Sequence, residues 1–157
     1  MLRKSLSISS SSPEETTALG SRIGTILTSG DVILLEGPIG AGKTHFARSL
    51  IQSTLSTYED VPSPTFTLVQ TYNTEIGEIW HADLYRLNSP NEVIELGLVD
   101  AFQDSICLIE WPDRLGELAP ASALTMHFKS VTNENHRALK MSWNNTRWNQ
   151  IEEIVPR

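Results

Sequence analysis

A glycine-rich stretch near the start of the chain has the residue types and the spacing that bind the phosphates of a nucleotide. It reads G-x-x-x-x-G-K-[ST] and consists of Gly37, Pro38, Ile39, Gly40, Ala41, Gly42, Lys43 and Thr44. Glycines let backbone N–H groups point inward toward an anion, and the lysine can reach the β- and γ-phosphates. The Thr44 hydroxyl can ligate the Mg²⁺ that the phosphates carry. The stretch therefore predicts that the chain binds a nucleoside triphosphate.

The segments on either side of this stretch fit that interpretation. Residues 31–36 form an apolar, β-prone run suited to a buried parallel strand. Residues 44–55 carry apolar side chains at helical spacing. A strand, a glycine-rich turn and a helix are the context in which this motif forms a phosphate site.

Two carboxylates are candidates for the magnesium and hydrolysis chemistry. Glu110 follows four apolar residues, which is typical of a Walker-B strand whose acid binds magnesium. Asp83 ends a more polar run, where it could hold magnesium through water or orient the attacking water. The alternative for Glu110 is a solvated glutamate at the end of a buried strand, and the alternative for Asp83 is a solvated loop aspartate. His81 either belongs to the same site or is a hydrogen-bonded structural histidine.

Two other features are open to a structural and a functional interpretation. The segment Ser63–Thr67 includes Pro64 and follows Pro62, which excludes a helix there. It is either a stiff connection or a switch that senses the γ-phosphate, because such switches follow the first helix of phosphate-loop proteins. Trp111 either caps the core or forms a wall of the nucleotide site.

The remaining pattern predicts the elements that position these residues. A helix capped by Ser12 is expected from Pro13 to about Thr28, a second begins after Ser89, and Gly97 interrupts or ends it. Other expected elements are an edge strand or flexible segment in 1–11 with a serine loop at 9–12, strands in 66–72, 78–87 and 106–110, an antiparallel hairpin at 124–143 with a loop at 132–136, and a helix at 147–155. The chain is expected to be one nucleotide-binding domain, 1–157.

Composition narrows the function classes further. The chain has 157 residues and a formal net charge of −7, so no broad basic surface for nucleic acid is expected. The one cysteine, Cys107, excludes an internal disulfide and a cysteine-rich metal site. No apolar run approaches the length of a membrane span and the N-terminus lacks an apolar signal region, so a cytoplasmic protein is expected.

Four blocks of the sequence resemble the TsaE family of bacterial ATP-binding proteins, which takes part in making threonylcarbamoyladenosine in tRNA. The matching blocks are residues 37–44, 63–69, 81–87 and 106–112. The resemblance implies a phosphate-loop NTPase fold of the α/β class: a sandwich with a mainly parallel central sheet, antiparallel edge strands and helices on both faces. In the hairpin loop, Asn135 and His136 stand where many relatives have a glycine, so the resemblance gives no basis for a nucleotide contact there.

The resemblance also implies roles for individual residues. It assigns the phosphates of ATP or ADP to Lys43 and the glycines of the loop, Mg²⁺ to Thr44 and Glu110, and the position beside the γ-phosphate to Asp83. The remaining roles are a first switch in Ser63–Thr67 that includes Thr65, a contact of Trp111 with the nucleotide, and a position of Ser12 and Thr16 near the adenine. Asp83 and Lys43 are the expected catalytic residues.

The implied activity is weak, magnesium-dependent ATP hydrolysis that supports a complex of TsaD and TsaB homologues. In that complex TsaD performs the transfer to adenosine, and tRNA contacts the chain only indirectly. Two alternatives share the phosphate loop. One is a nucleotide-gated binding module without meaningful turnover, and the other is a small-molecule kinase, which would need a lid with arginines and an acceptor pocket.

Overall fold

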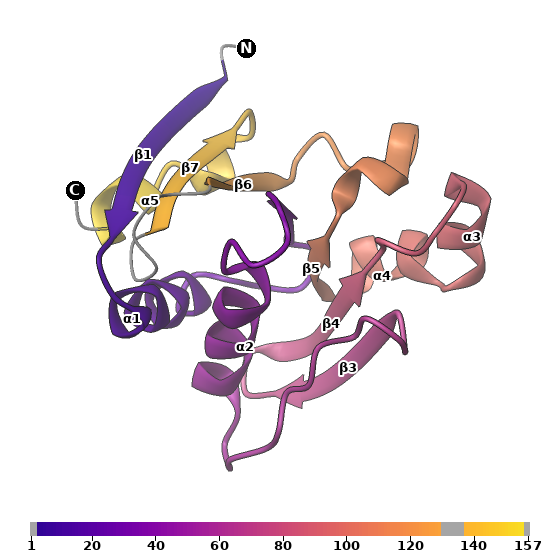
Figure 1. The fold of residues 1–157 in the computed structure, drawn as a ribbon, viewed down its shortest axis with the longest axis horizontal. Coiled ribbons are helices and arrows are strands. Elements are labelled where there is room, and N and C mark those ends of the chain that lie inside the picture. Colours follow the sequence, from indigo (N-terminus) through magenta and orange to yellow (C-terminus); the bar gives the residue numbers. More distant parts are fainter. Residues whose placement is uncertain (1–2, 130–136, 156–157) are drawn as a thin grey trace.

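A seven-stranded sheet forms the centre of the molecule, with strand order β1-β7-β6-β2-β5-β4-β3 (Figure 1). The computed structural model describes residues 3–129 and 137–155, and the predicted hairpin loop 132–136 lies outside these ranges. The four central strands, β6, β2, β5 and β4, are parallel to one another. The flanking pairs β1·β7, β6·β7 and β3·β4 are antiparallel. The predicted α/β fold with a parallel centre and antiparallel edges is confirmed.

The elements have the following bounds. The strands are β1 Lys4–Ser10, β2 Val32–Glu36, β3 Val69–Thr74, β4 Gly77–Asp83, β5 Ile106–Glu110, β6 Leu124–Lys129 and β7 Arg137–Trp143. The α-helices are α1 Pro13–Gly24, α2 Lys43–Thr54, α3 Pro90–Glu95, α4 Leu98–Asp104 and α5 Ile151–Ile154, and the 3₁₀ segments are η1 Pro112–Leu118 and η2 Thr146–Trp148. None of the helices in the described ranges is long and apolar enough to cross a membrane.

Helices cover both faces of the sheet because its central strands are apolar on both sides. In β2, Ile33 and Leu35 belong to the core beneath α1, α2 and α5, whereas Val32 and Leu34 belong to the core beneath α3, α4 and η1. The two helices that follow the first two strands, α1 and α2, lie side by side on the first face (Figure 1). Because successive side chains of a strand point to opposite faces, each buried strand contributes apolar residues to the cores on both faces of the sheet.

The register of the parallel strands brings their carboxyl ends together. Leu35 near the end of β2 pairs with Glu110 at the end of β5, and Glu110 pairs with Asp83 at the end of β4. The segments that leave these three strands therefore begin at one edge of the sheet. In open α/β sheets, this edge is where ligands bind.

The first helix is shorter than predicted. It ends at Gly24, where the Thr25 hydroxyl donates to the carbonyl of Arg22 over 2.6 Å. Ile26 and Leu27 still pack against or within the core, which is why the apolar spacing suggested a helix up to Thr28. The prediction of a helix over 25–28 was wrong because core packing continues after the backbone has left the helix.

Other boundaries also differ from the sequence predictions. The predicted helix 147–155 is two short segments, η2 and α5, because Trp148 Nε1 donates to the Ser122 carbonyl and holds the first turn in place. The strand predicted from residue 66 begins at Val69, since Leu68 has a φ of 69° and breaks the extended run. Ser9 and Ser10 belong to β1 rather than to a loop, and α4 was not predicted.

Candidate nucleotide and magnesium site

The glycine-rich stretch forms a loop between β2 and α2, as the sequence predicts. Gly42 is the residue before α2, and its φ of 107° is a conformation that side chains rarely adopt. At Gly37, whose φ is 140°, a side chain would collide with the backbone of Phe128 on β6. These glycines therefore allow both the turn into α2 and the close packing of the loop on the sheet.

Lys43, the first residue of α2, is a buried cation at the base of this loop. Only 4% of it is exposed. Its ammonium donates to the carbonyl of Gly37 and lies 3.7 Å from the centroid of the Trp111 ring. Burial lowers the pKa of Lys43, and the charges of nearby carboxylates, Glu110 foremost, oppose that shift. A phosphate group would supply an anion at a place where a cation has already been desolvated.

A chain of short hydrogen bonds joins Thr44 to the end of β5. The Thr44 hydroxyl donates to Glu110 Oε1 over 2.7 Å, and His81 Nε2 lies 2.7 Å from Glu110 Oε2. Both His81 and Glu110 are buried. A hydroxyl and a carboxylate oxygen suit Mg²⁺, which takes one or two protein ligands and otherwise keeps waters and phosphate oxygens. In residues 3–129 and 137–155 no group of three or more acidic, His or Cys side chains could hold a metal. Thr44 and Glu110 therefore fit Mg²⁺ only together with a nucleotide, whose phosphate oxygens would supply further ligands.

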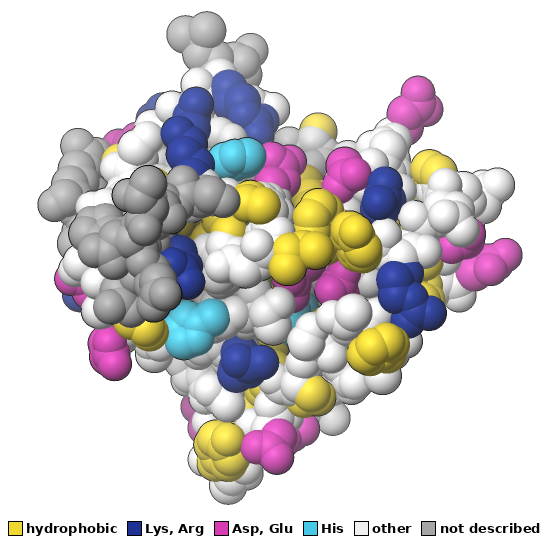
Figure 2. Space-filling view, viewed as in Figure 1, with side chains coloured by type: hydrophobic (Ala, Val, Ile, Leu, Met, Phe, Trp, Pro, Cys, Tyr) yellow, Lys and Arg dark blue, Asp and Glu magenta, His cyan; other side chains and the backbone are white. Residues whose placement is uncertain are grey.

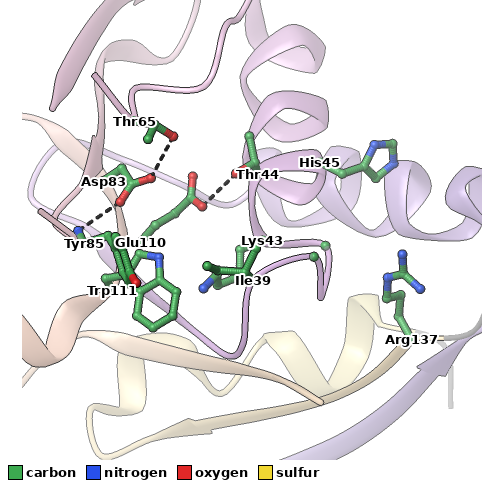
Figure 3. A pocket seen from close by; sticks show the side chains of 12 residues that line it. Ile39, Lys43, Thr44, His45, Thr65, Asp83, Tyr85, Glu110, Trp111 and Arg137 are labelled. Carbon is green, nitrogen blue, oxygen red and sulfur yellow. Dashed lines mark hydrogen bonds between the residues drawn. The ribbon is translucent and has the colours of Figure 1, made fainter. Parts of the chain in front are cut away.

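The second carboxylate, Asp83, is tied to the segment predicted as a switch. One oxygen of Asp83 accepts from the Tyr85 amide over 3.0 Å, and the other accepts from the Thr65 hydroxyl over 3.3 Å. Arg86 donates to the carbonyls of Thr65 and Phe66. These contacts hold the middle of Ser63–Thr67 at the site, and Figure 3 shows the bond from Thr65 to Asp83.

These residues surround a cavity of about 500 Å³, a size typical of small-ligand sites. Figure 2 shows acidic side chains in the hollow at the middle of this face, close to a group of hydrophobic side chains. The lining consists of Ile39, Gly40, Gly42, Lys43, Thr44, His45, Thr65, Asp83, Tyr85, Glu110, Trp111 and Arg137. Nine of these were predicted as site residues, so the fold brings most of the predicted site into one place.

Five predicted site residues lie elsewhere. Gly37 and Pro38 line a neighbouring cavity of about 320 Å³ that Trp111 also borders, and Ala41, within the loop itself, is buried. Ser12 caps α1 by accepting from the Glu15 amide, and the buried Thr16 hydroxyl bonds to Ser10 over 2.7 Å. Neither lines the main cavity, and their position near an adenine stays a prediction.

Three lining residues were not predicted. Tyr85 packs on Trp111 with ring centroids 4.8 Å apart, and its place two residues after Asp83 was the available signal. His45 directly follows the phosphate-loop motif, and its ring bonds to the Thr17 hydroxyl on α1. Arg137 comes from β7, and no local pattern connects it with residues about a hundred positions earlier.

Three comparisons place this chain among known proteins. Residues 10–139 match the family described as "Threonylcarbamoyl adenosine biosynthesis protein TsaE". The chain is similar to the tRNA threonylcarbamoyladenosine biosynthesis protein TsaE of Rickettsia felis, with 37% identity over 88% of this chain and 81% of the relative. It is 36% identical to the protein of the same name from Bacillus subtilis, over 74% of this chain and 73% of that one.

The structural comparison agrees with the sequence comparisons. The crystal structure of Bacillus subtilis YdiB superposes with a TM-score of 0.79 and 26% identity, covering 99% of this chain and 96% of that one. The family match covers the phosphate loop, Asp83 and Glu110, which meet at one edge of the sheet. The chain belongs to the TsaE family of tRNA threonylcarbamoyladenosine biosynthesis proteins.

Proposed function

We propose that this chain binds ATP or ADP with Mg²⁺ in the cavity above the sheet edge and hydrolyses ATP weakly. Its role lies in tRNA threonylcarbamoyladenosine biosynthesis, the process of its family. In this proposal the nucleotide cycle supports a complex of TsaD and TsaB homologues, and the chain does not carry out the transfer to adenosine. The tRNA reaches the chain only through that complex.

The observation that carries the proposal is the contact between Thr44 and Glu110. The two predicted magnesium ligands are far apart in the sequence, yet the Thr44 hydroxyl lies 2.7 Å from Glu110 Oε1. A hydroxyl at the start of the phosphate-loop helix that faces an acid from the neighbouring strand is the protein's share of a magnesium site in phosphate-loop NTPases. If Mg²⁺ replaced this hydrogen bond, the Thr44 hydroxyl and Glu110 Oε1 would both face the metal.

The other residues have separate tasks in this mechanism. Mg²⁺, when bound, neutralises charge that develops on the phosphates. Lys43 adds a second positive charge at the base of the loop. Asp83 can orient the attacking water, since the Tyr85 amide and the Thr65 hydroxyl fix its carboxylate at the cavity and each oxygen keeps a second lone pair for water. Trp111 limits the access of solvent on the side of Lys43.

Two isosteric substitutions test these roles. We expect Glu110→Gln to make ATP affinity less dependent on magnesium, because a charged ligand is lost. We expect Asp83→Asn to keep ATP affinity within a few-fold but to slow hydrolysis by roughly 10- to 100-fold, the low end of what a positioned base supplies. The measurements are a magnesium titration of ATP affinity by calorimetry and phosphate release in the presence of the partner proteins.

The outcomes separate the proposal from its alternatives. Loss of magnesium dependence in Asp83→Asn, with none in Glu110→Gln, would reverse the two assignments. Unchanged binding and hydrolysis in both variants would reject this cavity as the nucleotide site. If nucleotide binds as expected but no turnover occurs with partners present, the chain is a nucleotide-gated binding module instead.

The rim of the cavity suggests where the partners bind. Ile39, Phe66 and Tyr85 are large apolar side chains that are 76%, 84% and 46% exposed. Ile39 and Tyr85 line the cavity, and Phe66 follows the lining residue Thr65. Because a partner that covers this rim would also contact the phosphate loop and the predicted switch, its binding would depend on the nucleotide. Phe66→Asp should weaken binding to TsaD and TsaB homologues while leaving ATP affinity within a few-fold.

A further inference from the structure

We infer that His81 is a positioning residue for the magnesium ligand Glu110. It holds one carboxylate oxygen, so that the other faces Thr44 and the metal. The inference rests on the proposed function, because Glu110 is a magnesium ligand only in that proposal. His81 itself does not line the cavity, so it would act only through Glu110.

The strand register explains how the two side chains meet. His81 pairs with Leu108 across the parallel strands β4 and β5, and Glu110 lies two residues further along β5 on the same side of the sheet. His81 Nε2 is 2.7 Å from Glu110 Oε2. Both side chains are almost fully buried, at 0% and 3% exposure. A hydrogen bond to a carboxylate in such a site is stronger than one in water and fixes the orientation of the carboxylate.

The hydrogen-bond partners determine which nitrogen of His81 carries the proton. His81 Nδ1 is buried and has no partner in the described part of the chain. A carboxylate can only accept hydrogen bonds, so the short contact requires a proton on Nε2. In this arrangement Glu110 Oε2 is occupied by His81 and Oε1 by Thr44. Because Thr44 is itself a proposed ligand, its bond to Oε1 gives way to the metal, whereas His81 keeps Oε2 occupied and leaves Oε1 to face the metal.

A matched pair of substitutions tests the positioning role. Gln and Met have similar lengths, but only Gln can donate a hydrogen bond from about the position of Nε2. We expect His81→Met to raise the magnesium concentration for half-maximal ATP binding by about 10- to 100-fold, as is typical when the partner of a metal ligand is removed. We expect His81→Gln to stay within a few-fold of the wild type. The readout is a magnesium titration of ATP affinity by calorimetry.

Two controls distinguish positioning from a general loss of structure. Ile79 lies two residues earlier on β4, is fully buried and belongs to the same side of the sheet. Ile79→Ala should lower the thermal stability without changing the magnesium dependence. In a chain that already carries Glu110→Gln, His81→Met should add no further change in the magnesium dependence, because the ligand it positions is gone.

The wild-type chain provides a test that needs no substitution. Nitrogen-15 NMR of the imidazole should find a proton on Nε2 of His81, whether or not Nδ1 also carries one. A proton on Nδ1 alone would overturn the inference, and so would equal magnesium dependence in the Met and Gln variants. If Glu110→Gln itself leaves the magnesium dependence unchanged, the proposed function fails and this inference fails with it. If Glu110→Gln changes it and His81→Met does not, only the inference about His81 fails.

Discussion

Lys43 is a buried ammonium whose hydrogen bond in this structure goes to a neutral carbonyl oxygen. A nucleotide would replace that contact by charge-assisted hydrogen bonds to phosphate, worth about 1.5–3 kcal/mol. We therefore expect Lys43→Ala to weaken ATP binding by roughly 10- to 150-fold in calorimetry. Lys4→Ala, an exposed lysine on the edge strand β1, should leave the affinity unchanged. Equal ATP affinities of the wild type and Lys43→Ala would contradict the assignment of residues 37–44 as the phosphate-binding loop.

Cys107 should make the molecule sensitive to alkaline pH. Burial raises the pKa of its thiol from 9.0 to about 12. Below pH 9 the thiol is protonated in both the folded and the unfolded chain, and it has no effect on the pH dependence. Above pH 9 only the unfolded chain loses the proton, so stability should fall by about 1.4 kcal/mol per pH unit up to about pH 12. Urea unfolding at several pH values should show a shallower loss in Cys107→Ala than in the wild type.

At the scale of elements, the segment from Ser63 to Leu68 has few contacts that are independent of the site. Thr65 bonds to Asp83, and Arg86 bonds to the neighbouring carbonyls. If a γ-phosphate orders this segment, the amides of residues 66–69 should exchange hydrogen more slowly with ATP bound than with ADP. Hydrogen-exchange mass spectrometry measures this difference.

Two threonines of this segment form a matched pair for the same experiment. Thr65→Ala should remove the difference between the nucleotides, because Thr65 contacts Asp83. Thr67→Ala should keep it, because Thr67 bonds to Gln70 on β3 instead. Equal protection of these amides from hydrogen exchange with ATP and with ADP in the wild type would reject the switch and support a stiff connection.

Elements with strong local signals could be predicted from the sequence, whereas those set by tertiary contacts could not. The phosphate loop, β2 and β5 combine glycine spacing with continuous apolar runs, and both signals are local. The helix α4 was not predicted as a separate element: Gly97 was expected to interrupt or end the second helix, and its φ of 84° separates that helix from α4, which begins at Leu98. The end of α1 was misplaced because the same apolar residues serve a helix and the coil that follows it.

The candidate site shows the same division. Lys43, Thr44 and Glu110 each stand at the end of a recognisable element, so their roles could be predicted from pattern and resemblance. The hydrogen bond of His81 to Glu110 depends on the parallel register of β4 and β5, which the sequence does not encode in any local motif. Arg137 reaches the cavity only because β7 folds back beside β6.

At the scale of the whole molecule, Arg147 connects the C-terminal segment to the entry of the central strand β2. Its guanidinium bonds to both oxygens of Asp31, a carboxylate that is only 8% exposed, and to the carbonyl of Ile26. Arg147→Ala would leave a buried acceptor without this donor, so we expect unfolding free energy to fall by about 1–3 kcal/mol. The exposed pair of Lys4 and Glu152 is the control, and Lys4→Ala should change stability by less than about 0.5 kcal/mol. Denaturant unfolding with equal losses in both variants would contradict this account.

The pairing of β1 with β7 has a consequence for how the protein is made. Lys4 pairs with Trp143, so β1 has to wait for a partner strand that is the last one in the described residues. At translation rates of about 5–20 residues per second, that wait is on the order of ten seconds. A waiting strand exposes an unpaired edge to other nascent chains. In β1, serines separate the only two apolar residues, Leu6 and Ile8, which limits this hazard until β7 has been synthesised.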